Sequence, residues 1–330
     1  MAIMTYIEAI RDAQRQEMLR DPDVFIAGED VAILGSSFGQ TAGLYAEFGA
    51  GRVLDTPISE GQIVSLGVGA AAMGLRPVLS LDFCDFLGCC FDEILNQAAK
   101  MTYMLNGQTS IPLVIRANLG GELNAAAQHS QCLESLFTHI PGLKVVASSG
   151  PRLAKGLLSQ AIRDNNPVMV FEHKGLGGKR EEVPEGAFAL PFGKAEIMSE
   201  GGDVTLVSWS KMVHKCVNAA RALAAGGVRA EVIDLVSLYP MDMDTVLSSV
   251  RKTGRIIIVH EAVETGGFGA EIAARIADEA FDFLKAPVKR VGAPFAPVPF
   301  SPALEKHYQP NEERIIAAVN SLIAQEGAGA

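Results

Sequence analysis

An acidic residue, Glu60, is the first candidate for chemistry because of where it stands in the chain. It closes the run Leu54–Glu60, a short apolar strand that ends in a turn, and the apolar, Gly/Ala-rich segment Gly61–Gly74 follows it. A carboxylate between a buried strand and a buried helix is costly unless it has a polar or basic partner. Such a partner could be a nitrogen of a heterocyclic cofactor.

A histidine, His129, is the second candidate. It lies among small residues in Ala125–Gln131, before a predicted helix, and a loop histidine can act as an acid, a base or a hydrogen-bond donor near neutral pH. The alternative is a structural histidine with its hydrogen bonds satisfied. His139 has a similar but weaker setting, and we interpret the remaining candidates as structural: His214, His260 and His307.

Two further groups have both a structural and a functional interpretation. Phe83, Phe86 and Phe91 lie at a strand-to-helix junction, where they either pack in the core or form a wall for a flat ring. The segment Ala161–Pro167 ends a predicted helix with several carbonyl groups and an acid, Asp164. Such an end can hold a cation with oxygen ligands, and Asn/Asp capping is the alternative.

Several common site motifs are absent. Gly67 and Gly69 begin like a dinucleotide-binding fingerprint, but the third glycine is missing and the pair lies inside a predicted helix. The glycines of Gly266–Gly269 are better placed, after a strand, but a tight turn explains them. The chain has no P-loop, no HExxH and no GxSxG, so local support for nucleotide, zinc-protease or serine-hydrolase chemistry is lacking.

The elements that must position these residues alternate between helices and short apolar strands. This alternation indicates an α/β layer fold with a mostly parallel sheet. In the first half we predict helices at Tyr6–Leu19, Gly61–Met73, Phe86–Leu105 and Arg152–Asp164, and strands at Val24–Gly28, Pro77–Phe83, Ile111–Arg116 and Val168–Glu172. In the second half we predict strands at Val204–Trp209, Ala230–Leu235, Arg255–His260 and Pro287–Val291, and helices at Met212–Ala225, Met243–Val250, Gly269–Leu284 and Asn311–Ala324.

A change of composition divides the chain. From Lys174 to Gly202 it is rich in Gly, Glu and Lys and contains Pro184 and Pro191, as an interdomain connection would. We therefore predict two α/β domains, at residues 1–185 and 203–330, with a linker at 186–202.

The composition excludes several classes. Of 330 residues, 48% are apolar and 20% charged, with a net charge of −10 and no basic stripe, so we expect no nucleic-acid partner. No apolar run is long enough for a membrane span, and the N-terminus has no secretory pattern. The five cysteines form no CxxC or zinc spacing, which favours a reducing, cytoplasmic location.

Several segments occur together in a specific order. They are Asp55–Glu60, Gly74–Pro77, Gln97–Lys100, Gln128–Gln131, Pro141–Val146, Ala161–Pro167 and Pro240–Asp242. On these segments the chain resembles the β subunit of the thiamine-diphosphate-dependent E1 component of 2-oxoacid dehydrogenase complexes, over roughly Thr5 to Ala324. The resemblance implies a thiamine pyrimidine-binding first domain and a transketolase C-terminal-like second domain.

The resemblance also implies partners. Such enzymes anchor the diphosphate through Mg²⁺ held by a Gly-Asp-Gly…Asn motif, and no Gly-Asp-Gly occurs in this chain. In this family a separate α subunit carries that motif. We therefore expect an α2β2 heterotetramer that shares thiamine diphosphate between subunits and passes its product to a lipoyl-bearing E2 acyltransferase. The chain alone should be inactive.

The resemblance assigns roles to individual residues. Glu60 matches the acid that hydrogen-bonds the pyrimidine N1′, and Phe86 matches the aromatic residue beside the ring, with Ile58 also expected at the cofactor. His129 matches the histidine that faces the bound intermediate and the incoming lipoyl group. The match to a structural potassium site comprises Leu113, Ala161, Ile162, Asp164 and Asn166, mostly through backbone carbonyls.

Within the family, the segment Asp85–Lys100 looks most like acetoin dehydrogenase β subunits, and Thr138–Gly142 and Glu172–Lys174 agree. Gly266–Ile272 is shared with the pyruvate and branched-chain types. We therefore expect acetoin cleavage, with acetaldehyde released and a two-carbon unit passed to lipoyl-E2. The alternatives are a pyruvate or branched-chain 2-oxoacid dehydrogenase subunit, a self-contained transketolase-type enzyme, which the missing Gly-Asp-Gly disfavours, and a non-catalytic scaffold for the α subunit and E2.

Overall fold

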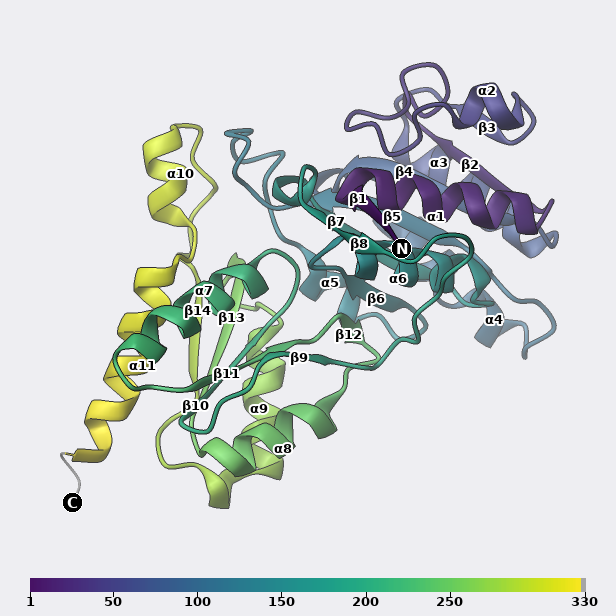
Figure 1. The fold of residues 1–330 in the computed structure, drawn as a ribbon. Coiled ribbons are helices and arrows are strands. Elements are labelled where there is room, and N and C mark those ends of the chain that lie inside the picture. Colours follow the sequence, from purple (N-terminus) through teal and green to yellow (C-terminus); the bar gives the residue numbers. More distant parts are fainter. Residues whose placement is uncertain (328–330) are drawn as a thin grey trace. The chain divides into compact units, whose positions relative to one another are not determined.

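The computed structural model describes residues 1–327 and divides the chain into two compact units (Figure 1). Unit 1 comprises Met1–Leu119 and Leu136–Phe192, and unit 2 comprises Gly120–Ser135 and the chain from Gly193 onward. The division at Phe192 falls within the predicted linker 186–202, and the domain limits 1–185 and 203–330 stay a proposal. Among the described residues, no helix has the length and apolar character needed to cross a membrane.

The core of unit 1 is a parallel sheet, as predicted. Its strands run in the order β6 (Lys144–Ala147), β7 (Val168–His173), β5 (Val114–Leu119), β4 (Arg76–Phe83), β2 (Val24–Gly28) and β3 (Val53–Asp55). Every residue of β2, β5 and β7 is buried. Strands buried on both faces are rich in apolar residues, which is why the sequence pattern revealed them, although β5 and β7 also bury polar residues such as Arg116 and Glu172.

Helices cover this sheet. The larger ones are α1 (Tyr6–Arg20), α3 (Glu60–Ala72) and α6 (Pro151–Arg163), and the smaller elements are β1 (Ala2–Thr5), α2 (Leu44–Phe48) and β8 (Arg180–Val183), with β1 and β8 paired antiparallel. α1 begins with a capping box in which Thr5 and Glu8 satisfy each other's backbone amides. It packs against α6, and Glu17 of α1 binds Arg163 of α6 at 2.7 Å.

The predicted helix Phe86–Leu105 is wrong. The segment forms a 3₁₀-helix (Cys84–Cys90), a π-helix (Glu93–Ala98) and the short α4 (Met101–Met104). The buried positions explain the change of winding, because they are three residues apart at first and four apart later: Cys84, Leu87, Cys90, Ile94 and Ala98. Tertiary packing therefore selects tight and then wide turns over a uniform α-helix.

Unit 2 repeats the α/β plan. Its sheet has the order β14 (Lys289–Ala293), β13 (Ile256–Val263), β10 (Val204–Ser208), β11 (Ala230–Asp234) and β9 (Glu196–Ser199), parallel except for β9. The helices are α7 (Met212–Ala225), α8 (Met243–Thr253), α9 (Gly269–Glu279), α10 (Pro302–Tyr308) and α11 (Glu312–Gly327), with a short β12 (Ser237–Tyr239) and a 3₁₀ turn (Phe281–Phe283). The predicted strands and helices of this half are confirmed, except that the α9 helix stops before Leu284.

The segment Gly120–Ser135 was not predicted to leave the first domain. It has no regular structure until α5 (Glu134–Thr138). It belongs to unit 2, although the strands before and after it in the chain, β5 and β6, belong to the sheet of unit 1. Its anchoring therefore comes from side chains far along the chain.

Candidate active site

Glu60 is positioned by β3 and α3. It is the first residue of α3, directly after the turn that follows β3, and it is half-buried. The first turn of a helix favours a negative charge because the backbone N–H groups there lack intrahelical acceptors. The carboxyl ends of parallel strands are also where α/β sheets bind ligands. The local fold therefore presents the Glu60 carboxylate at the edge where a ligand is expected.

The turn before Glu60 is tied to the loop that follows β2. The Ala32 backbone N–H donates to Asp55 Oδ1 at 2.7 Å, and the Thr56 N–H donates to the Gly28 carbonyl at 3.0 Å. These two bonds hold the loop after β2 against the start of α3.

That loop brings a second acid, Glu29, near Glu60. Burial first, and then the charges of Glu60, Asp82 and Asp30, raise the pKa of Glu29 to about 7. The Glu29 Oε1 atom is buried and has no hydrogen-bond partner among the described residues. A buried acid with an unsatisfied oxygen can hydrogen-bond a protonatable nitrogen of a heterocycle. The pair therefore has the residue type expected at a pyrimidine nitrogen.

Sequence reasoning missed Glu29, although a signal was present. Glu29 directly follows the buried strand β2, just as Glu60 closely follows the neighbouring strand β3. Acids at the carboxyl ends of adjacent parallel strands meet at one edge of the sheet, so the two together would have indicated an acidic cluster.

Replacing Glu29 by glutamine is expected to stabilise the chain at pH 8 by about 1–3 kcal/mol and to leave its stability at pH 4.5 unchanged. The folded chain protonates Glu29 below about pH 7, whereas the ordinary pKa is 4.5. Between these values the folded state binds more protons, so stability falls as pH rises and the cost is complete above about pH 7. Denaturant unfolding at both pH values measures the difference.

The exposed Glu182 of β8 offers a matched control, because Glu182→Gln should change neither stability. An equal gain for Glu29→Gln at pH 8 and pH 4.5 would contradict the explanation from ionisation.

Phe86 stands in a row of aromatic rings. It lies in the 3₁₀-helix after β4 and meets Phe83 edge to face at 5.5 Å, and Phe83 meets Phe38 in the same way at 6.0 Å. Phe91 instead packs on Phe137, with ring centroids 6.0 Å apart. The row Phe38–Phe83–Phe86 thus agrees with an aromatic wall, whereas Phe91 takes the core-packing alternative.

Ile58 is an apolar residue left in the open. Its side chain is 83% exposed, and Ile33 and Leu34 on the neighbouring loop are 82% and 70% exposed. Such exposure is consistent with a surface that a ligand or another subunit covers.

A buried charge pair supports the loop that carries Glu29. The Arg116 guanidinium of β5 donates to both oxygens of Glu172 of β7, at 2.7 and 2.9 Å. Gln40 of the loop donates to Glu172 at 3.5 Å and to Asn118 at 3.1 Å, and it accepts from Ser36 at 2.6 Å. The sheet therefore holds the loop through polar groups that are themselves buried.

His129 lies elsewhere, in the segment Gly120–Ser135 of unit 2. It is half-buried, and its backbone N–H donates to the Ala126 carbonyl at 3.5 Å. Glu60, Ile58 and Phe86 all belong to unit 1. A site that His129 shares with Glu60 is therefore a prediction.

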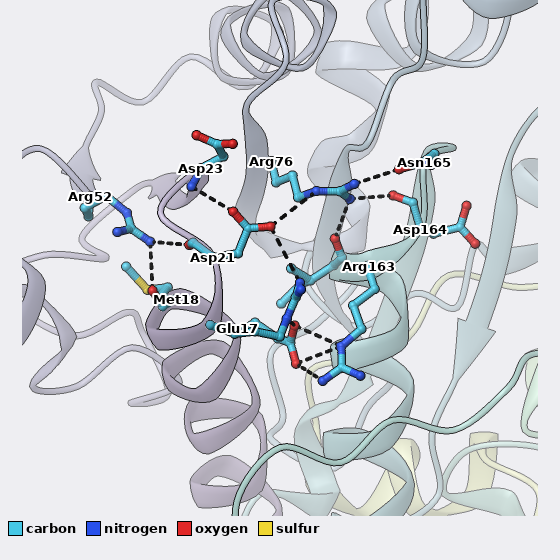
Figure 2. A network of polar contacts seen from close by, with 11 residues as sticks. Glu17, Met18, Asp21, Asp23, Arg52, Arg76, Arg163, Asp164 and Asn165 are labelled. Carbon is cyan, nitrogen blue, oxygen red and sulfur yellow. Dashed lines mark hydrogen bonds and ion pairs between the residues drawn. The ribbon is translucent and has the colours of Figure 1, made fainter.

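The residues predicted to hold potassium gather at the end of α6, and Figure 2 shows that Arg76 of β4 reaches this place. Arg76 Nη1 donates to the carbonyls of Ile162 and Asp164 at 3.0 and 3.1 Å, and Nη2 donates to Asn165 Oδ1 at 2.7 Å. Its Nε lies 3.6 Å from Asp21.

The other oxygens of this group also have donors. The Leu113 carbonyl accepts the Val168 N–H at 2.9 Å, and the Ala161 carbonyl accepts the Asp164 N–H at 3.2 Å. The Asp164 carboxylate binds the Lys144 ammonium and the Asn166 N–H. The guanidinium of Arg76 and the ammonium of Lys144 already neutralise these oxygens, so the site leaves little attraction for an added potassium ion. The potassium site that the resemblance implies is untested, and these contacts disfavour it.

Exchanging potassium for choline in the buffer is therefore expected to leave the melting temperature of the chain unchanged. In contrast, Arg76→Gln should lower the free energy of unfolding by about 1–3 kcal/mol, because charge-assisted bonds to three oxygens are lost. In that variant, potassium should restore part of the loss. Differential scanning fluorimetry in both buffers tests this, with the 74%-exposed Arg229 replaced by glutamine as the control. A potassium-dependent rise in the melting temperature of the unmodified chain would show that both cations bind.

Comparison with family models matches both halves of the chain. Residues 2–179 match the transketolase pyrimidine-binding domain, and residues 193–315 match the transketolase C-terminal domain. These limits agree with two units that each have a mostly parallel sheet.

Curated relatives match over nearly the full length. The chain is 51% identical over 325 residues to the β subunit of acetoin:2,6-dichlorophenolindophenol oxidoreductase from Cupriavidus necator, covering 96% of each chain. It is 45% identical over 323 residues to the β subunit of the pyruvate dehydrogenase E1 component from Rhizobium meliloti, covering 98% of this chain and 70% of that protein.

Among solved structures, a split-gene transketolase described as an inactive β4 tetramer matches with a TM-score of 0.79 and 24% identity, covering 97% of this chain and 98% of that one. This likeness bears on the fold alone.

Proposed function

The chain belongs to the family of E1 β subunits of acetoin and 2-oxoacid dehydrogenases, which are thiamine-diphosphate enzymes, and from this premise we propose that it serves acetoin cleavage. The observation that supports the chemistry is the acidic pair of Glu60 and Glu29 at the carboxyl edge of the pyrimidine-domain sheet. The Oε1 atom of Glu29 is buried there without a hydrogen-bond partner among the described residues. The 51% identity to an acetoin oxidoreductase β subunit supports the choice of substrate.

Thiamine diphosphate, when bound, supplies the carbon nucleophile that breaks the bond next to a carbonyl group. Glu60 would hold a proton at the pyrimidine N1′, where a carboxylate in a poorly solvated place exchanges protons efficiently. Glu29 stays protonated up to about pH 7, so it adds little repulsion to Glu60 below that pH. Phe86 and Ile58 would border the ring and exclude water.

His129 would face the reacting carbon and the incoming lipoyl group, where an imidazole can donate or accept a proton near neutral pH. We propose that a separate α subunit holds the diphosphate and Mg²⁺, in an α2β2 assembly, because this chain lacks the Gly-Asp-Gly motif. A lipoyl-bearing E2 acyltransferase would accept the two-carbon unit.

Oxidative decarboxylation of pyruvate or of a branched-chain 2-oxoacid is the second candidate. The 45% identity to a pyruvate dehydrogenase β subunit favours it, since the difference from the acetoin relative is small.

One assay separates these substrates. The chain is combined with the α subunit encoded beside it, thiamine diphosphate and Mg²⁺, and an artificial electron acceptor reports turnover of acetoin, pyruvate and 2-oxoisovalerate. We expect the highest kcat/KM with acetoin. A higher value with pyruvate or 2-oxoisovalerate would overturn the substrate and leave the cofactor assignment standing.

A further inference from the structure

The segment Gly120–Ser135 is held in a strained conformation. Three of its residues that are not glycine have left-handed backbones, Glu122, Asn124 and Ala126, with φ values of 72°, 53° and 62°. Such residues are rare in this region, and they persist only where surrounding contacts determine the backbone. His129 follows three residues after the last of them, so the same contacts determine where its imidazole lies.

The contacts come from carboxylates of unit 2. The two oxygens of Glu305, in α10, accept the backbone N–H groups of Glu122 at 2.9 Å and Asn124 at 3.1 Å. Glu261, at the end of β13, accepts the Gly121 N–H at 2.7 Å. Hydrogen bonds from backbone amides to a carboxylate are among the stronger ones, and Glu305 is only 3% exposed.

The packing around these carboxylates is close. A methyl group at Gly121 would lie 2.1 Å from Gln309 Nε2 and 2.6 Å from Glu305 Oε1, so a side chain there would have to displace both of these groups. The Gln309 side chain also donates to Glu261 at 3.3 Å, and the Gln309 backbone N–H donates to the Glu305 backbone carbonyl at 3.1 Å. Gly121, Glu261 and Glu305 therefore form one closely packed cluster.

The far end of the segment is anchored as well. The Trp209 indole N–H donates to Glu134 Oε1 at 2.9 Å. At the near end, the Lys211 ammonium pairs with the Glu122 carboxylate. The Gly120 N–H donates to the Gln131 carbonyl at 3.1 Å, which closes the loop around His129.

We propose that Glu305 is a positioning residue whose carboxylate holds Gly120–Ser135 in the conformation in which His129 acts. This inference rests on the proposed role of His129 in acyl transfer to the lipoyl group. Glu305 fixes two amides five and seven residues before His129, whereas His129 itself contributes the imidazole. Loss of the carboxylate would relax the left-handed residues and displace the imidazole without removing it.

The test uses the reconstituted complex with the α subunit, thiamine diphosphate and Mg²⁺, and lipoamide as the acyl acceptor. Glu305→Gln keeps the shape but not the charge, so its one carbonyl oxygen cannot accept both amides. We expect kcat for lipoamide acylation to fall about tenfold or more, the range for a misplaced acid-base group, with KM for acetoin unchanged. Glu305→Asp keeps the charge and should lose less. Glu313→Gln, an exposed acid of α11, is the matched control and should have no effect.

A double-variant cycle separates positioning from general damage. If Glu305 acts through His129, then adding Glu305→Gln to His129→Ala should cost less than about twofold beyond His129→Ala alone. Losses that multiply would overturn the inference. Amide hydrogen exchange over residues 120–131 should rise in Glu305→Gln and stay unchanged in Glu313→Gln, and unchanged exchange in Glu305→Gln would also overturn it.

Two outcomes separate the role of His129 from that of Glu305. Normal lipoamide acylation by His129→Ala would overturn the proposed function of His129 and, with it, a positioning role exercised through that residue. A reduced rate in His129→Ala, combined with a normal rate in Glu305→Gln, would overturn the inference about Glu305 alone.

Discussion

Glu60→Gln is expected to lower turnover of acetoin by the reconstituted complex by about a hundredfold or more, the scale of a lost general acid-base group. Glutamine keeps the size of the side chain and the start of α3, but it cannot take up or release a proton at the pyrimidine N1′. Affinity for the α subunit should not change, because the bond from the Ala32 N–H to the Asp55 carboxylate and the bond from the Thr56 N–H to the Gly28 carbonyl both remain. Steady-state kinetics with an artificial electron acceptor measures the effect.

Glu182→Gln, a change of an exposed acid in the same unit, is the control and should leave turnover as it is. Turnover of Glu60→Gln within about twofold of the unmodified complex would favour the scaffold alternative, in which the chain docks the α subunit and E2 without taking part in the reaction.

Arg116→Met is expected to lower the free energy of unfolding by about 3–5 kcal/mol. The Arg116 and Glu172 side chains are 2% and 3% exposed, and the change leaves the Glu172 carboxylate buried without its positive partner. The loop carrying Glu29 should also loosen, because Gln40 of that loop donates to Glu172 at 3.5 Å. Denaturant unfolding followed by circular dichroism measures the loss.

The double variant Arg116→Met/Glu172→Met provides the comparison. Removing both charges leaves no unpaired ion, so we expect it to be more stable than Arg116→Met alone. If the double variant were less stable than either single variant, then the pair would contribute by packing and shape more than by charge balance.

The parts of the site that sequence could predict are those fixed by local pattern. Glu60 was identifiable because a buried strand and an apolar helix flank it, and α3 begins at that residue. The parallel sheet was likewise predictable, since β2 is a continuous apolar run and β7 begins with four apolar residues, Val168–Phe171. In these places the burial of each residue follows from its neighbours in the chain.

The rest depended on contacts between distant segments. The change from 3₁₀ to π winding at Cys84–Ala98 follows from packing and not from helix propensity. The raised pKa of Glu29 requires knowing that β2 and β3 are neighbours in the sheet. Likewise, no local pattern links Glu122 to Glu305, which is 183 residues away in the chain. Arg76 at the potassium residues is a further example, because a strand and a helix end must meet before the guanidinium reaches Ile162.

The central claim is that this chain contributes an acid-bearing half of a thiamine-diphosphate site and completes it only with an α subunit. The most direct measurement is acetoin turnover by the purified chain with thiamine diphosphate and Mg²⁺, before and after the α subunit is added. The account predicts no turnover by the chain alone and turnover once the α subunit is present. Turnover by the chain alone would contradict it.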